Sequence, residues 1–353
     1  MSALGSLTET LDVGVTHGGP DMMGVPPHDL SSNSNACGPY PPAAQSLREA
    51  DARHYPDPSY TELIVQLATW HGVAPSRIVL GGSGSELIQR LSVAVAIHAS
   101  ASGQVASVWV PVHAYGDYAH AANAAGLRRV PGSEQATLIW ACDPSSPLGL
   151  AHENLAQQVA TLQATQTMVL DQAYAPLRLS GALALDESGL DRVWRLITPN
   201  KALGLTGVRA AYAIAPRHES ALLARVRALA PSWPIGAHGV ALLQCWATVD
   251  ADQWLAECRK TLQIWKARQI RLLSASGWSV APSDANFFVI ARGHEARAEG
   301  EFDMKTSLEA LRLRGIKLRD CASFGLPGRA RMAVTSPAVQ DELMRALSEE
   351  GRA

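Results

Sequence analysis

The chain reads TPNKALGLTGVR from Thr198 to Arg209, between one apolar run that ends at Ile197 and another that begins at Ala210. This pattern places one lysine, Lys201, directly after a predicted strand and before a glycine-rich turn. A lysine at a strand end in a partly dry site has a lowered pKa, so its neutral amine can form an imine with an aldehyde. A single lysine after a strand is more often a solvated surface residue, so this interpretation depends on its neighbours.

A second candidate lies about thirty residues upstream, where the short apolar strand predicted at 167–171 ends in Asp171. Tyr174 follows three residues later. An acidic side chain can keep the ring nitrogen of a pyridine cofactor protonated, so that the ring takes up electrons, and a phenol can hydrogen-bond the oxygen beside the imine. The lysine, the carboxylate and the phenol together therefore predict chemistry on a pyridine aldehyde.

A phosphate site is indicated by segment 78–88, which reads as a strand, a turn of Gly and Ser residues, and the start of a helix. Backbone N–H groups at such a helix N-terminus bind anions, and Gly84 and Ser85 are the predicted donors. Similar turns join strands to helices in most α/β proteins, so this motif carries weight only together with the others.

Short apolar runs alternate with helical stretches, and this predicts an α/β fold with a mostly parallel sheet that helices cover on both faces. The predicted strands are 77–80, 105–110, 137–141, 167–171, 193–198 and 210–214. In such sheets ligands lie outside the carboxyl ends of the strands, where several of the motifs fall. A smaller α/β domain is predicted from strands at 278–281, 287–291, 317–319 and 330–334 and helices at 304–314 and 337–349.

The composition favours a globular enzyme that acts on a small molecule. The 353 residues suffice for a large core and a second domain, and the net charge of −2 at pH 7 provides no footprint for nucleic acid or an anionic membrane. Five scattered cysteines without a C-x-x-C pair argue against a metal cluster or disulfide framework and favour a cytoplasmic protein. Residues 1–15 lack a signal-peptide pattern, and no segment reads as a membrane span.

Taken in order, these motifs resemble those of fold type I pyridoxal-phosphate (PLP) enzymes of the class I/II aminotransferase family. The resemblance is closest to the group of histidinol-phosphate aminotransferase and threonine-phosphate decarboxylase, an enzyme of cobalamin biosynthesis. Further segments that carry it are HYPDP at 54–58, YGDY at 115–118, DPSSPLG at 143–149, DANF at 284–287 and RARMAV at 329–334. It implies a large domain around the central sheet and a small C-terminal α/β domain.

The resemblance also implies roles for individual residues. Lys201 would bind PLP covalently, Asp171 would support the ring nitrogen, and Tyr174 with Ser146 would contact the ring's 3-oxygen. Tyr115 would stack on the ring, with Tyr118 and His113 as alternatives. The implied phosphate contacts are those of Gly84, Ser85, Thr198, Arg209 and, from a neighbouring subunit, Tyr55.

On the substrate side, the resemblance assigns Arg331 to a substrate carboxylate or its equivalent, with Arg329 as the nearby competitor. Asn35 lies in a loop that usually lines this side of the site. His17 opens a His-Gly-Gly motif that is implied to hold a substrate phosphate, and the alternative is a turn with an incidental histidine.

The chain departs from the family pattern at Ala36, where a proline is usual in the loop that contains Asn35, and at two positions nearer the imine. Ser146 stands where an asparagine is usual, and Asn200 stands where a serine or threonine precedes the lysine. A serine can still donate a hydrogen bond, but its shorter reach needs a water or a shifted loop. These changes bear on how the imine is tuned.

The predicted organisation is an N-terminal arm over residues 1–42 that joins the small domain, a large PLP-binding domain over 43–255 and a small domain over 256–353. The resemblance implies a homodimer with shared active sites. We predict an aminotransferase that acts on a small amino acid or a phosphorylated amine. Two alternatives stay open: an L-threonine-O-3-phosphate decarboxylase-like enzyme, and a protein of the same fold that binds without turnover.

Overall fold

The structure is a computed structural model that describes residues 17–218, 221–293 and 303–350. The predicted arm is therefore described from His17 onward, and residues 1–15, for which the sequence predicts no signal peptide, lie outside the described residues. Among the described helices, none combines the length and the apolar character needed to cross a membrane.

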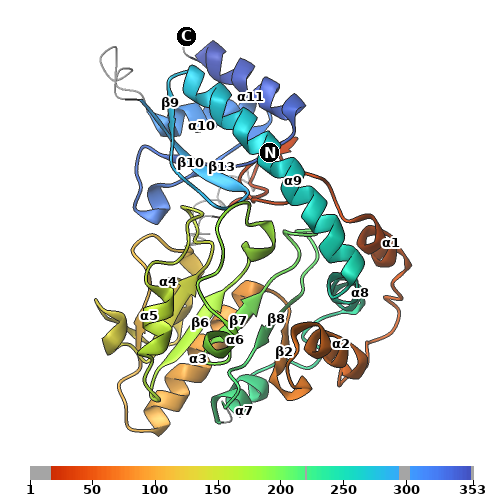
Figure 1. The fold of residues 1–353 in the computed structure, drawn as a ribbon, viewed down its shortest axis with the longest axis vertical. Coiled ribbons are helices and arrows are strands. Elements are labelled where there is room, and N and C mark those ends of the chain that lie inside the picture. The colour runs from red at the N-terminus through yellow and green to blue at the C-terminus, as the bar shows by residue number, and fades with distance from the viewer. Residues whose placement is uncertain (1–16, 219–220, 294–302, 351–353) are drawn as a thin grey trace, which may run out of the picture.

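A seven-stranded sheet forms the centre of the larger part of the molecule (Figure 1). Its strands are β2 (Ile78–Gly81), β3 (Ser107–Trp109), β4 (Arg128–Arg129), β5 (Leu138–Cys142), β6 (Thr167–Asp171), β7 (Trp194–Ile197) and β8 (Ala211–Ile214). Across the sheet they lie in the order β2, β8, β7, β6, β5, β3, β4. Neighbours are parallel except where β8 pairs with β2 and β7. The prediction of a mostly parallel sheet is confirmed.

Helices bury both faces of this sheet. They are α1 (Pro41–Glu49), α2 (Thr61–His71), α3 (Gly84–Ala101), α4 (Gly116–Ala124), α5 (Leu155–Ala160), α6 (Glu187–Leu190), α7 (Ala221–Ala228) and α8 (Ala237–Trp246). Alternate residues of β5 join different clusters: Trp140 packs among residues of α3 and α4, whereas Ile139 packs among residues of α5. Because successive side chains of a strand point to opposite faces, all of β5 is apolar and buried.

The helix that follows β2 has a defined start. Ser83 is its N-cap residue, and the Ser83 Oγ accepts a hydrogen bond from the Glu86 N–H at 3.0 Å. The N–H groups of Gly84 and Ser85 at the first helical positions are left for another acceptor. The turn therefore presents backbone donors beyond the carboxyl end of β2.

The smaller part of the molecule is built on a four-stranded antiparallel sheet. Its strands, in the order β12, β13, β10, β9, are Arg319–Asp320, Ala330–Ala333, Phe287–Arg292 and Trp278–Val280. It is accompanied by α10 (Met304–Leu313) and α11 (Pro337–Glu350). The N-terminal arm reaches this part, because β1 (His28–Asp29) pairs in parallel with β11 (Ile316–Lys317).

One predicted strand is divided in the structure, and one long helix spans the predicted domain boundary. The strand predicted at 317–319 is divided, because β11 pairs with the arm and β12 pairs with β13. The long helix α9 (Val249–Ala275) runs without interruption through the predicted domain boundary at 255. It packs against α8 near its start and against β9 and α11 farther along, so it connects the two parts (Figure 1).

Candidate active site

A cavity of about 760 Å³ lies beyond the carboxyl ends of the large-sheet strands and is closed on one side by the small sheet and the arm. Most of the predicted site residues line it: His17, Gly84, Ser85, Tyr115, Ser146, Asp171, Tyr174, Thr198, Lys201, Arg209 and Arg331. Tyr55 and Asn35 are the predicted residues that do not line it.

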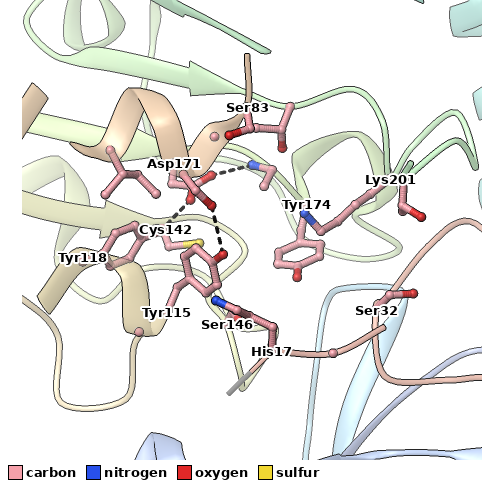
Figure 2. A pocket seen from close by; sticks show the side chains of 18 of the residues that line it. His17, Ser32, Ser83, Tyr115, Tyr118, Cys142, Ser146, Asp171, Tyr174 and Lys201 are labelled. Atoms are coloured by element: carbon pink, nitrogen blue, oxygen red, sulfur yellow. Dashed lines mark hydrogen bonds between the residues drawn. The ribbon is translucent and has the colours of Figure 1, made fainter. Parts of the chain in front are cut away.

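Asp171 ends β6, with its side chain 5% exposed. One carboxylate oxygen, Oδ1, accepts the Ala173 N–H at 2.8 Å, and the other, Oδ2, accepts the Tyr118 hydroxyl at 2.6 Å (Figure 2). Burial raises the pKa of Asp171, and these two donors oppose the rise. A buried carboxylate of this kind is suited to a cationic partner such as a protonated ring nitrogen.

Lys201 lies in the turn after β7, and its Nζ is 5.4 Å from the centroid of the Tyr174 ring (Figure 2). The Tyr174 hydroxyl accepts a hydrogen bond from the Asn33 side chain at 3.4 Å. The unusual Asn200 has a local role, since its Oδ1 accepts the Lys201 N–H at 3.0 Å. Its Nδ2 donates to the Thr206 carbonyl at 3.3 Å, so Asn200 bridges both ends of the lysine turn.

The arm holds the lysine turn from the other side. The backbone N–H of Asn35 donates to the Lys201 carbonyl at 3.0 Å, and its Nδ2 donates to the Ala202 carbonyl at 2.9 Å. The structure thus places Asn35 behind the lysine turn, where it fixes the backbone instead of facing the cavity.

The N-terminus of α3 and the end of β7 together form a cradle for an anion. A Cβ built on Gly84 would lie 2.8 Å from Thr198 Cγ2, so only glycine permits this close approach. The Thr198 Oγ1 is buried and has no hydrogen-bond partner in the described protein. An unpaired buried hydroxyl beside free helix N–H groups fits the phosphate of PLP, and Arg209 at the rim adds a positive charge.

Tyr115 precedes α4, and its hydroxyl lies 3.3 Å from the Ser85 Oγ. Burial raises the pKa of Tyr115, so the phenol stays neutral. The alternatives for the stacking residue are placed differently. Tyr118 is fully buried behind Tyr115, and His113 is hydrogen-bonded through Nδ1 to the Phe324 carbonyl at 2.7 Å.

The small sheet contributes two buried arginines. The Arg331 guanidinium donates from Nη1 to the Ser146 Oγ at 2.9 Å and from Nη2 to the Ser31 carbonyl at 2.8 Å, while its Nε has no partner among the described residues. Arg329 is exposed and does not line the cavity.

Arg319 lines the same cavity and was not singled out from the sequence. It lies directly opposite Arg331 in the pairing of β12 with β13, so both side chains project from one face of the sheet. Burial and the charge of Arg331 lower the pKa of Arg319. Apolar and charged residues alternate from Ile316 to Arg319, so Arg319 shares its face with Lys317 and has no signal of its own in the sequence.

His17 lies at the mouth of the cavity, with its side chain 47% exposed. Its Nε2 is 3.5 Å from the Asp117 carboxylate, and its ring centroid is 5.7 Å from that of Tyr115 (Figure 2). Tyr55 lies elsewhere on the surface. It is 76% exposed and stacks on Trp233 with ring centroids 4.3 Å apart.

Comparison with known families gives one match over most of the chain. The family of class I and II aminotransferases matches residues 26–347. A histidinol-phosphate aminotransferase from Jannaschia sp. (strain CCS1) is 28% identical over 362 residues, which cover 96% of this chain and 96% of that protein.

Solved structures share the fold. An L-threonine-O-3-phosphate decarboxylase from Porphyromonas gingivalis superposes with a TM-score of 0.75 at 18% identity, covering 92% of this chain and 99% of the other. A histidinol-phosphate aminotransferase from Sinorhizobium meliloti, in complex with pyridoxal-5'-phosphate, gives 0.74 at 21% identity, covering 96% of each chain.

Proposed function

Because the chain belongs to the class I and II aminotransferase family, we propose that it is a PLP-dependent aminotransferase whose substrate is a small amine with an anionic group, such as a phosphate. One observation carries this proposal: a lysine amine, a buried carboxylate and an anion cradle face the same cavity. PLP, when bound, supplies an aldehyde for an amine and a ring that takes up electrons.

Each residue then has a defined task. With PLP held in the cavity, the Lys201 amine would act as the general base and acid that moves a proton away from the substrate carbon and delivers it to the cofactor. The Tyr174 ring lies close to this amine and restricts its position. Asp171 holds a negative charge in a dry environment, where it stabilises a positive charge most strongly.

The substrate class is proposed from the two buried guanidiniums. Arg319 and Arg331 lie directly opposite each other in neighbouring strands, and both side chains line the cavity. Two planar guanidiniums suit a phosphate or carboxylate group. The histidinol-phosphate aminotransferases among the relatives agree with a phosphorylated amine.

A second candidate function is that of a phosphoamino-acid decarboxylase. The observation that favours it is the position of His17 at the cavity mouth, where it can reach a substrate phosphate. The same lysine and carboxylate serve both reactions, which differ in the bond that breaks. Release of carbon dioxide without any keto-acid requirement would establish the decarboxylase and contradict the transaminase.

We also propose a cytoplasmic homodimer. The exposed stack of Tyr55 on Trp233 is an apolar surface that a second subunit would cover, in line with the role implied for Tyr55. Sedimentation of the wild-type protein and of the Tyr55→Ser variant tests this point, and a wild-type monomer would contradict it.

The central test is an absorbance spectrum of the protein with PLP, recorded for wild type, Lys201→Ala and the control Lys260→Ala, an exposed lysine. We expect a visible band in the wild type and control that is absent from Lys201→Ala. Amino acids and phosphorylated amines are then added, and one substrate class should shift the band. A wild type without any band would favour a binding protein without turnover.

A further inference from the structure

The hydroxyl of Tyr118 is a buried polar group that lies beside the Asp171 carboxylate and the Cys142 thiol. Its side chain is fully buried at the start of α4, and the hydroxyl donates to the Asp171 Oδ2 at 2.6 Å (Figure 2). Buried hydroxyls require a partner, and hydrogen bonds to a charged group are about twice as strong as those between neutral groups. The bond therefore stabilises both the buried hydroxyl of Tyr118 and the buried carboxylate of Asp171.

The ring of Tyr118 is held so that its hydroxyl has little choice of position. It stacks on Trp140 with centroids 4.6 Å apart and an interplanar angle of 6°. Its other side meets the edge of Tyr115, with centroids 5.7 Å apart at 85°. Trp140 belongs to β5, which pairs directly with β6, the strand that carries Asp171. The Tyr118 ring is thus held by β5, and the Asp171 carboxylate is carried by the strand paired with it.

We propose that Tyr118 is a positioning residue for Asp171: its hydroxyl keeps the carboxylate ionised and in one orientation, so that the carboxylate can support the protonated ring nitrogen of PLP. The inference rests on the cofactor chemistry described above. It assigns to Tyr118 a role that neither ring stacking nor core packing provides.

The electrostatics of the site explain why a donor is needed. Burial raises the pKa of Asp171, and the forces that oppose this are the Tyr118 hydroxyl, the Ala173 amide and the charge of Lys201. The other titratable groups near it are Asp117, which raises the same pKa, and the Cys142 thiol. Without the hydroxyl, one of the main donors that oppose this rise in pKa is lost, and the neutral form of Asp171 is favoured more strongly.

The test is the Tyr118→Phe variant, which retains the ring and its stacking but lacks the hydroxyl. We expect the Kd for PLP, measured by fluorescence titration of the apo-protein, to rise about tenfold, the scale of one hydrogen bond to a charged group. The kcat should fall by a similar factor while KM changes little. The pH dependence of the absorbance band of the bound cofactor should also differ from that of the wild type. Tyr212→Phe is the matched control, because Tyr212 is also fully buried but binds His71 and Trp246 away from the cavity.

A double-mutant cycle separates positioning from a general loss of packing. In the Asp171→Asn background, Tyr118→Phe should add almost nothing to the loss of PLP affinity, because the two residues act as one unit. An equal loss in both backgrounds, or a loss no larger than that of Tyr212→Phe, would overturn the assignment. If Asp171→Asn itself leaves PLP binding and the absorbance band intact, the role proposed for Asp171 fails and that of Tyr118 fails with it. If Asp171→Asn weakens PLP binding and Tyr118→Phe does not, only the role proposed for Tyr118 is refuted.

Discussion

Arg331 of β13 donates a hydrogen bond to the hydroxyl of Ser146 at 2.9 Å, across the boundary between the two parts of the molecule. Ser146 is the residue at which the family pattern has asparagine, so this departure has a structural counterpart. The serine hydroxyl holds an arginine of the substrate side.

Removing this hydroxyl tests which ligand Ser146 serves. In Ser146→Ala the Nη1 of Arg331 loses its acceptor, so the guanidinium is less well fixed, and we expect KM for the amine substrate to rise about tenfold. The absorbance band of the bound cofactor should stay in place. Ser145→Ala is the control, because that hydroxyl accepts the Leu150 N–H. A shifted band with an unchanged KM would instead assign Ser146 to the cofactor.

Thr198 should show opposite effects on stability and on cofactor binding. Its Oγ1 is buried without a partner, so replacing it by a methyl group in Thr198→Val should leave the apo-protein as stable or make it more stable. The Kd for PLP should rise about tenfold, because a phosphate contact is lost. Thermal unfolding of the apo-protein and a PLP titration measure the two effects. A less stable apo-protein with normal PLP affinity would contradict the assignment.

Arg319 should determine which substrates bind well. Arg319→Lys keeps the charge but loses the planar pair of donors, so KM for phosphorylated amines should rise about tenfold while KM for amines without phosphate changes little. Steady-state kinetics with both substrate classes provide the measurement, and the exposed Arg329→Lys is the control. Equal changes for both classes would mean that Arg319 does not recognise the phosphate.

Acid should destabilise the protein through His71. Burial lowers the pKa of His71 from 6.5 to about 4. Between these values the unfolded chain binds a proton that the folded protein does not, so the free energy of unfolding falls as the pH is lowered, by at most about 1.4 kcal/mol per pH unit. Denaturant unfolding of wild type and His71→Gln across this range should show a shallower pH dependence in the variant. Identical slopes would exclude His71 as the cause.

Most of the large sheet could be predicted because its apolar strands carry their signal in consecutive residues, whereas the exposed edge strand β4 (Arg128–Arg129) has no apolar run and was missed. β6 has the predicted bounds, since a short apolar run that ends in a carboxylate marks a buried strand without help from the rest of the chain. Asp171 and Lys201 lie at the ends of such runs, and their shared position beyond the sheet follows from the parallel arrangement.

Contacts between distant segments were beyond the reach of such patterns. Arg319 lies opposite Arg331 only because β12 pairs with β13. Apolar and charged residues alternate without a break from β11 into β12, so the sequence gave no reason to separate the two strands. Asn35 holds the lysine turn through backbone carbonyls, which no residue type in that turn reveals. The bond from Tyr118 to Asp171 likewise joins a helix to a strand that no local pattern connects.

The pairing of β1 with β11 has a consequence for the order of events during synthesis. The arm is synthesised early, yet the strand that receives it follows every strand of the large sheet in the chain. Until β11 has been made, β1 lacks the strand with which it pairs, and β1 precedes the arm residues Ser31 and Ser32 that line the cavity. A nascent chain can therefore build its large sheet early, but it completes the arm side of its cofactor site only after β11 has emerged.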